Sequence, residues 1–340
     1  MQDKTVSIIC PIYNEEKYIG RFVQSVIDQD YDQSLMEVLL IDGRSTDNTR
    51  QLIHDIIGKH PFIKLIDNPR QTVPFALNAG IRESQGEIIV RLDAHCRYPR
   101  NYISRLVSAL DELHADNVGG AFHTVPAHDN NICTAIALAS SNRFGVGNSE
   151  HKVGSRMVKE VDTVPFGCYH RSIFDKVGLF DEELIRNQDD EFNARVINHG
   201  GKIYLLPDVV IDYTARDSIQ KMCRMYYQYG LFKPLVNKKL GKPATLRQFV
   251  PALFLLGLLI GLFISLLWHP FLWVYLSVLA AYLCIGLGIG ISSAIKCHKP
   301  ALVLLMPLTF FCIHCSYGWG YLRGIYKVIF NKPFTAKVNR

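Results

Sequence analysis

The chain has 340 residues, a formal net charge of +6 and 49% hydrophobic residues. A single hydrophobic core rarely extends beyond roughly 250 to 300 residues, so the length implies one large domain and a further element. The positive charge would suit nucleic acid, but basic residues gather just before the first long apolar run, at Lys233, Lys238, Lys239, Lys242 and Arg247. Because anionic lipid headgroups fit that placement better, we expect a membrane partner and no nucleic acid.

The first 125 residues alternate short β-branched runs with helix-periodic segments, which is the pattern of βαβ units and predicts an α/β fold. Strands are predicted at 6–12, 36–41, 63–67 and 88–92. The first, second and fourth of these runs are almost continuously apolar, which indicates strands that are covered on both faces. Ligands of such sheets bind at the carboxyl ends of the strands, so the polar residues there are the candidate site.

Beyond residue 125 the pattern becomes less regular. Residues 130–159 combine glycines with polar residues and show little periodicity, which predicts a mobile loop. A polar helix is predicted at 188–199, and a strand at 202–206.

The carboxyl ends of the first two predicted strands carry the segments CPIYNEE and LLIDGRSTDNT, which bring Tyr13, Glu15, Asp42 and Asp47 to one edge of the sheet. An aromatic ring can stack on a nucleobase, and a carboxylate can accept a hydrogen bond from a base N–H. Tyr13 and Asp42 are therefore candidates for binding a nucleoside. The alternative is that Asp42 and Ser45 only cap the following helix.

The fourth predicted strand ends in VRLDAHCRYP, which places Asp93 and His95 two residues apart as the chain leaves the sheet. Alternate residues of an extended segment point the same way, so this carboxylate and imidazole can meet one ion. A divalent cation there would offset the charge on a leaving diphosphate. A DxH segment alone is weak evidence, since any surface turn can hold one.

A third polar segment, IRNQDDEFNAR, places Asp189, Asp190 and Glu191 at a predicted helix start. Carboxylates at this place suit the positive end of the helix dipole. They also offer a general base that takes the proton of an acceptor hydroxyl during direct displacement at an anomeric carbon. The segment is compatible with both interpretations.

Five segments, PIYNE, IDGRSTDNT, ALNAGI, LDAH and NQDDEF, occur in this order and together resemble glycosyltransferase family 2 over about two-thirds of the chain. Within that family the chain is most similar to bacterial exopolysaccharide enzymes of the succinoglycan glucosyltransferase type. The resemblance implies a GT-A fold with C-terminal transmembrane helices. It also implies inverting transfer from a nucleotide-diphosphate sugar, usually a UDP-sugar, with Mg²⁺ or Mn²⁺ as the divalent cation.

The resemblance further implies which residues bind the donor. Those expected near the donor are Pro11, Tyr13, Glu15, Asp42 and Asp93. Asp93 would also hold the metal, together with His95.

The resemblance makes Asp189 the catalytic base, with Glu191 supporting it and Asp190 as its rival. Two departures from the family pattern matter. The family's usual ED pair has become Gln188 and Asp189, and its common metal motif has a second Asp where this chain has His95. Because imidazole is a softer ligand than carboxylate, we expect Mn²⁺ to be preferred over Mg²⁺.

The processive synthases of the family carry a QxxRW motif, but the corresponding region here is YYQYGLF, so transfer of a single sugar is expected. A hexose such as glucose, moved to a lipid-linked or polysaccharide acceptor, follows from the resemblance. A sugar-1-phosphate nucleotidyltransferase would open with a glycine-rich loop, whereas PIYNEEKYIG is glycine-poor. The other alternative is a catalytically inactive partner protein of the same fold, which the intact Asp42, Asp93 and Asp189 disfavour.

Three segments, 249–268, 271–295 and 301–322, contain no Asp, Glu, Lys or Arg, and each is long enough to cross a bilayer, which takes about 20 apolar residues. Three spans would place the basic C-terminus outside, in conflict with the positive-inside rule. The last segment is therefore also a candidate for a re-entrant or interfacial element.

The expected organisation has four parts: a catalytic domain over 1–235, a basic juxtamembrane linker over 236–248, a membrane domain of two or three apolar helices over 249–330, and a basic tail over 331–340. The N-terminal region carries no signal-peptide pattern. We expect a multi-pass protein of the cytoplasmic membrane with a cytoplasmic catalytic domain.

Overall fold

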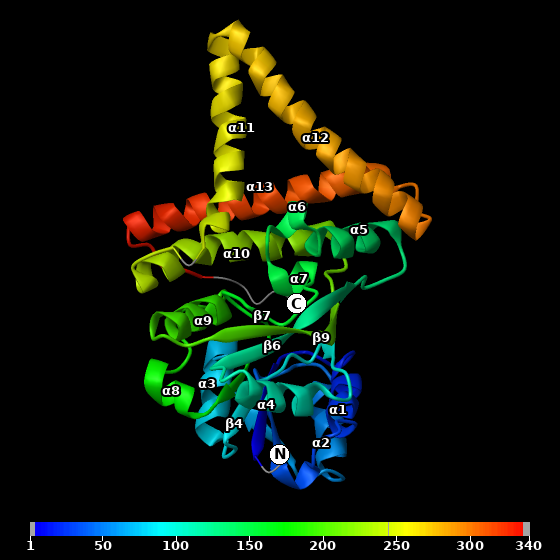
Figure 1. Cartoon of the computed structure of the whole chain (residues 1–340), viewed down its shortest axis with the longest axis vertical. Coiled ribbons are helices and arrows are strands. Elements are labelled where there is room, and N and C mark those ends of the chain that lie inside the picture. The colour runs from blue at the N-terminus through cyan, green and yellow to red at the C-terminus, as the bar shows by residue number, and fades with distance from the viewer. Residues whose placement is uncertain (1–3, 244, 336–340) are drawn as a thin grey trace. The chain divides into compact units, whose positions relative to one another are not determined.

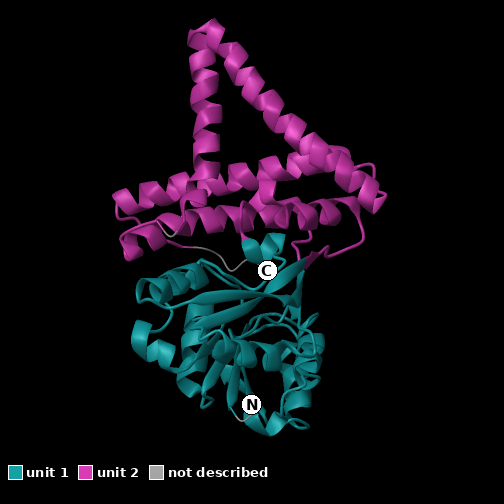
Figure 2. Ribbon diagram, viewed as in Figure 1, with its two compact units in different colours: residues 1–123, 150–213 teal, residues 124–149, 214–340 magenta. Residues whose placement is uncertain are grey.

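The structure is a computed structural model that describes residues 4–243 and 245–335 (Figure 1). It forms two compact units (Figure 2). The first contains the residues up to 123 and residues 150–213, and the second contains residues 124–149 and the residues from 214 onward. This grouping places 124–149 and 214–235 with the apolar helices, although the sequence assigned them to the catalytic domain. The range 1–235 for that domain stays a prediction.

The described residues form a nine-stranded mixed sheet. Its strand order is β3 (Ile63–Asp67), β2 (Met36–Asp42), β1 (Val6–Ile12), β4 (Ile88–Arg91), β8 (Cys168–His170), β6 (Asn117–Val125), β9 (Ile203–Thr214) and β5 (Cys96–Arg97), with β7 (Lys159–Glu160) beside β9. The first four strands are parallel, and β8 joins them antiparallel. The predicted strands are confirmed, except that β9 continues to Thr214 instead of ending at Leu206.

Helices cover both faces of the sheet in the first unit. The helices of this unit are α1 (Ile19–Ile27), α2 (Thr49–Ile57), α3 (Val73–Glu83), α4 (Tyr102–Glu112), α7 (Glu150–Val153), α8 (Ser172–Val177) and α9 (Gln188–Asn198), with a short 3₁₀ turn at Gln33–Leu35. Along β1, Ile8 and Cys10 face one hydrophobic cluster while Ile9 faces the other. The alternation of a strand thus feeds two cores, as the continuous apolar runs predicted.

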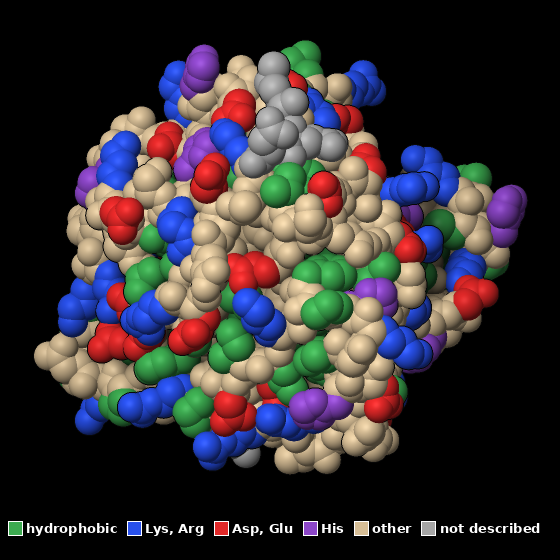
Figure 3. Space-filling model, turned by 90° about the horizontal axis from the view of Figure 1, so that it is seen from below, with side chains coloured by type: hydrophobic (Ala, Val, Ile, Leu, Met, Phe, Trp, Pro, Cys, Tyr) green, Lys and Arg blue, Asp and Glu red, His purple; other side chains and the backbone are tan. Residues whose placement is uncertain are grey.

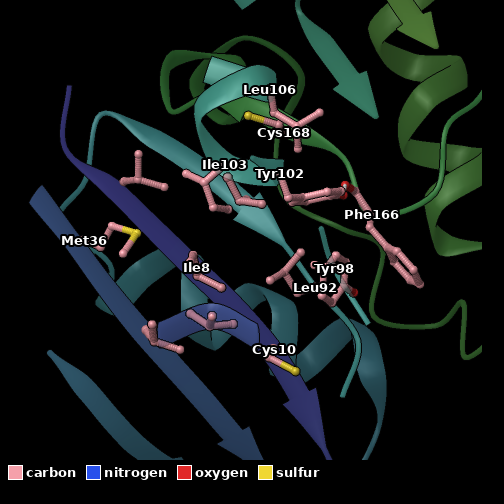
Figure 4. Packing of buried hydrophobic residues seen from close by; sticks show 14 of the residues in the cluster. Ile8, Cys10, Met36, Leu92, Tyr98, Tyr102, Ile103, Leu106, Phe166 and Cys168 are labelled. Atoms are coloured by element: carbon pink, nitrogen blue, oxygen red, sulfur yellow. Dashed lines mark hydrogen bonds between the residues drawn. The ribbon is translucent and has the colours of Figure 1, made fainter. Parts of the chain in front are cut away.

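One of these cores supports the chain where it leaves β4 (Figure 4). Tyr98 and Tyr102 lie edge to face with ring centroids 4.8 Å apart, inside the cluster that contains Ile8 and Leu92. The buried Tyr98 hydroxyl accepts a hydrogen bond of 2.8 Å from the backbone N–H of Asp93. Packing therefore fixes the backbone of the DAH segment.

The second unit is helical. It contains α5 (Asn131–Ser140), α6 (Arg143–Val146), α10 (Ile219–Leu240), a 3₁₀ turn at Leu246–Phe249, α11 (Val250–Leu267), α12 (His269–Cys297) and α13 (Leu302–Ile329). In Figure 1, α11 and α12 form a hairpin and α13 lies beside α10. By length and composition, α11, α12 and α13 could each cross a membrane, with mean hydropathies of 2.7, 2.1 and 1.5 over their most apolar windows.

The apolar helices expose many large hydrophobic side chains, which are rarely clustered on a surface that faces water. Leu259, Phe263, Leu266 and Trp273 on α11 and α12 are each more than half exposed. The face of the molecule in Figure 3, in contrast, intersperses acidic and basic side chains with small hydrophobic groups. A large exposed apolar surface is typical of a membrane interaction, so these helices indicate membrane association.

The mobile loop predicted over 130–159 is wrong, because the segment contains α5, α6 and α7. The Asn130 side chain accepts from the backbone N–H of Cys133 at 2.8 Å, and that of Asn142 accepts from Phe144 at 2.8 Å. These are N-caps of short helices. The sequence signal lay in these asparagines, and the scattered glycines concealed it.

The last apolar segment is also more regular than expected, since α13 continues through Pro307 as one helix. Of the predicted basic tail, Lys337 and Arg340 lie outside the described residues.

Candidate active site

The carboxyl ends of β1 and β4 lie close together. Pro11 is buried on β1 in register with Ile41 of β2, and Tyr13 follows at the edge with its ring partly exposed. Glu15 is 3% exposed, and its backbone N–H donates to Thr49 Oγ1 at 2.7 Å. Its carboxylate lies 3.8 Å from Nδ1 of His95, which places part of the predicted metal pair beside part of the predicted donor site.

Asp42 is completely buried at the end of β2. One carboxylate oxygen accepts from the Ser45 hydroxyl at 2.5 Å, and the other accepts from an Arg50 guanidinium nitrogen at 2.7 Å. The same Arg50 nitrogen donates to Asp67 on β3 at 2.9 Å. The carboxylate thus holds the turn after β2 and links it to β3. Its contact with a nucleoside stays a prediction.

A buried arginine links β4 to α9. The side chain of Arg91 is 7% exposed, and its two terminal nitrogens lie 3.4 Å from Asp93 Oδ2 and 3.9 Å from Asp189 Oδ2. Its guanidinium carbon also lies 4.6 Å from the ring centroid of Phe166, within the range of a cation–π contact. Asp93, which is predicted to bind the donor and the metal, and Asp189, the predicted base, therefore lie beside the same cation.

The three acids at the start of α9 have different surroundings. Asn187 adopts a left-handed φ of 61° just before the helix, and Asp189 then approaches Arg91. Glu191 instead forms a bidentate ion pair with Arg195, at 2.6 and 2.9 Å, and is 4% exposed. Asp190 is partly exposed between them. Since Arg195 also donates to the carbonyl of Leu179, Glu191 anchors the helix to the preceding loop.

The charged groups around Arg91 shift one another's pKa values. Burial raises the pKa of the Asp189 carboxyl, the nearby Asp190 and Asp93 raise it further, and Arg91 partly opposes this shift. Although burial disfavours the charge of Arg91, Asp189 and Asp93 raise the pKa of its guanidinium above the ordinary value. A carboxylate with a raised pKa is a better proton acceptor than an ordinary aspartate, which suits a general base.

No group of three or more His, Cys, Asp or Glu side chains is arranged to hold a metal ion in the part of the chain that the structure describes. The pair of Asp93 and His95 still suits an ion that is bound with its substrate, because Mg²⁺ commonly uses one or two carboxylates and takes its remaining ligands from phosphates and water. The chemistry of these two side chains therefore fits a metal site whose remaining ligands come from the substrate and water.

Arg91 was not among the site residues predicted from the sequence. Its signal was present, since a lone arginine interrupts the apolar run IIVRLD of a strand that is buried on both faces. A buried charge requires a partner, so this position alone indicates nearby carboxylates.

The chain matches the family described as Glycosyl transferase family 2 over residues 7–178. It belongs to this family. The match ends before α9, so the assignment of Asp189 as a base depends on the surroundings of this residue and on the resemblance of the NQDDEF segment.

Two curated relatives extend the family assignment. Over 340 residues the chain is 28% identical to the dolichyl N-acetyl-alpha-D-glucosaminyl phosphate 3-beta-D-2,3-diacetamido-2,3-dideoxy-beta-D-glucuronosyltransferase of Methanococcus voltae, covering 95% of this chain and 97% of the relative. Over 246 residues it is 26% identical to the succinoglycan biosynthesis protein ExoA of Rhizobium meliloti, covering 72% and 73%. The predicted likeness to exopolysaccharide enzymes is confirmed.

A solved structure supports the fold. The chain is similar to a mannosyltransferase of Pyrobaculum calidifontis in complex with GDP-Man and Mn²⁺, with a TM-score of 0.58, 20% identity and coverage of 95% of this chain and 88% of the other. The predicted GT-A fold is thus confirmed.

Proposed function

We propose that this family 2 glycosyltransferase moves a single hexose-type sugar, such as glucose, from a nucleotide-diphosphate sugar to a lipid-linked or polysaccharide acceptor, with inversion, in cell-surface glycan synthesis. The observation that carries the proposal is the cluster of Asp93, Arg91 and Asp189. In this cluster Asp93, the candidate ligand of the metal and diphosphate, lies 3.4 Å from the buried Arg91, and Asp189, the candidate base, lies 3.9 Å from it.

In the proposed reaction, the Asp189 carboxylate takes the proton of an acceptor hydroxyl. The hydroxyl oxygen forms a bond to the anomeric carbon from the face opposite the phosphate, and the bond from that carbon to the phosphate oxygen breaks. The electron pair leaves with the nucleoside diphosphate. A single displacement inverts the anomeric centre and needs one base, and such a base typically contributes about 10²–10⁴-fold to the rate.

Asp93 and His95 would hold a divalent cation, Mg²⁺ or Mn²⁺. When bound, the ion offsets negative charge on the leaving diphosphate. The similar fold of the mannosyltransferase that was crystallised with Mn²⁺ supports this part of the proposal. Chelation with EDTA should abolish transfer, and Mn²⁺ should restore more activity than Mg²⁺. Higher activity with Mg²⁺ would contradict the proposed role of His95 in metal preference.

A lipid-linked acceptor is supported by two features. The Methanococcus voltae relative is named for a dolichyl-linked sugar phosphate acceptor and aligns along almost the whole chain. The apolar helices α11, α12 and α13 would hold the enzyme at the membrane that contains such a lipid. We propose the cytoplasmic membrane, with the catalytic residues on the cytoplasmic side, where nucleotide sugars are made.

The test uses membranes that contain the full chain, a panel of nucleotide sugars, Mn²⁺ and a lipid extract as the source of acceptor, with release of nucleoside diphosphate as the readout. We expect the wild-type protein to consume one donor and Asp189→Asn to lose this activity. Asp190→Asn is the matched control, because it removes the neighbouring carboxylate and should keep most of the activity. Loss in Asp190→Asn with retention in Asp189→Asn would transfer the role of base to Asp190.

A further inference from the structure

The helix α13 has two contrasting faces. One face packs within the second unit, where Met306, Phe310, Ile313 and Tyr321 are almost completely buried. The other face is exposed and apolar. Among its exposed large hydrophobic residues, which recur at helical spacing, are Leu304, Leu308, Phe311, Trp319, Ile325 and Ile329. The buried face thus contacts protein, and the exposed apolar face suits contact with lipid.

The partner on the buried face is the charged helix α10. The two helices run side by side in the same direction (Figure 1). A Cβ atom at Gly230 would overlap the backbone of Tyr317, and Lys238 bonds the Asn331 side chain at 3.3 Å near the far ends of both helices. Glycines at such positions permit close backbone contact, so the two helices pack tightly along their length.

The helix α10 cannot follow α13 across a bilayer at low cost. It carries Lys221, Arg224, Lys233, Lys238 and Lys239 along its length. Each cation at the centre of a bilayer costs about 2.5–3.5 kcal/mol even on the mildest scale. Because α13 packs along α10, an upright α13 would draw these charges into the hydrocarbon.

The hairpin of α11 and α12 gives a second, independent constraint. A Cβ atom at Gly318 of α13 would meet the backbone of Pro251, at the start of α11, and Gly290, near the end of α12, meets the backbone of Val303. Two helices joined by a tight turn begin and end at the same side of the membrane. Since α13 touches both open ends of the hairpin, it connects two points at one membrane face.

We infer that α13 lies flat in one leaflet, with its exposed stripe against the acyl chains and α10 on the aqueous side, and that only α11 and α12 cross the bilayer. At 18 residues, α11 is about 27 Å long, close to the thickness of the hydrocarbon core. Lys296, Lys299, Arg323, Lys327 and the cations of α10 then share one side. The conflict with the positive-inside rule disappears, because a flat α13 leaves the C-terminus on that side.

Depth-dependent quenching of tryptophan fluorescence tests this inference, and its readout does not depend on catalysis. The chain has three tryptophans, Trp268, Trp273 and Trp319. In the full chain with all three changed to Phe, Phe311→Trp places one probe on the exposed stripe, midway along the charge-free run. Leu259→Trp in the same background places a matched probe midway along α11. Both variants are reconstituted in vesicles with lipids brominated near the headgroup or near the chain end.

For the Leu259→Trp probe, quenching should be stronger with the deep bromines. The Phe311→Trp probe should respond more strongly to the shallow bromines, because an interfacial helix enters only about 5–10 Å into the boundary. Restoring Trp319 as the only tryptophan should give the same shallow depth, whereas an upright helix would separate it from residue 311 by about 12 Å. Deep quenching of both the 311 and 259 probes would overturn the inference, as would no quenching of either.

Protease protection of the unaltered chain gives a second measurement that needs no substitution in the helices. With different tags at the two ends, in sealed and uniformly oriented vesicles, we expect both tags to be digested together or protected together. Protection of one tag and digestion of the other would show a third crossing and would overturn the inference.

Discussion

The acids at the two ends of the candidate site are held differently. At the β2 end, Asp42 is completely buried and its oxygens accept short bonds of 2.5 and 2.7 Å from Ser45 and Arg50. At the β4 end, Asp93 and Asp189 approach Arg91 only to 3.4 and 3.9 Å and remain 18% and 28% exposed. Asp42 therefore holds a turn, whereas Asp93 and Asp189 are the acids that we propose to meet the substrate.

The largest effect is expected at Asp189. We expect Asp189→Asn to reduce turnover by about 10²–10⁴-fold, because the amide cannot accept the acceptor proton. The thermal unfolding midpoint should change little, since the ion pair of this side chain with Arg91 is long, at 3.9 Å. Initial rates and thermal unfolding of the same detergent-solubilised sample give both values. If Asp189→Asn lost activity only because the protein unfolds, Asp189 would have a structural role like that of Asp42, and the prediction would be wrong.

The opposite result is expected at Glu191, two residues away. Glu191→Gln breaks the buried bidentate pair with Arg195, which should cost about 3–5 kcal/mol of unfolding free energy. As a control, Glu112→Gln removes an exposed partner of Arg105 and should cost no more than about 1 kcal/mol. If Glu191→Gln kept full stability and lost only activity, its predicted supporting role in catalysis would replace the anchoring role.

A smaller stability loss is expected at Asp42. Asp42→Asn presents an amide to Arg50 and should lower the unfolding free energy by about 1–3 kcal/mol, the cost of weakened hydrogen bonds to a buried charge. The neighbouring Asp67→Asn removes a half-exposed contact of the same Arg50 and should change stability by less than about 1 kcal/mol. Equal losses in both variants would show that burial of Asp42 contributes nothing. A rise in the donor KM for Asp42→Asn alone would support its nucleoside contact.

The smallest effect is a shift in pH dependence. The raised pKa of Asp189 means that activity falls, as the pH is lowered, at a higher pH than for an ordinary aspartate of pKa about 3.9. Arg91 lowers this pKa, so Arg91→Gln should move the acidic limb of the kcat/KM profile upward by about one pH unit. Arg91→Lys keeps the positive charge and should move it less. An acidic limb that moves to lower pH in Arg91→Gln would contradict the proposed coupling.

The sequence by itself determined the sheet and the family. Continuous apolar runs ending in PIYNE, LLIDG and VRLDAH fixed the first parallel strands and their polar ends, because side chains alternate along a strand and both faces must be buried. The ordered motifs were specific enough for family 2. The pattern was insufficient between residues 130 and 159, where two of the helices, α5 and α6, begin at single capping asparagines.

Only the tertiary structure decided which charges share a neighbour. Asp93 and Asp189 are almost a hundred residues apart, yet each lies within 4 Å of Arg91, because the end of β4 and the start of α9 lie close together. Sequence spacing cannot show such a meeting, since burial and the local electric field depend on every element that packs around the group. The same holds for α13. Its composition resembles that of a third span, and only its packing along the charged helix α10 reveals the division between its two faces.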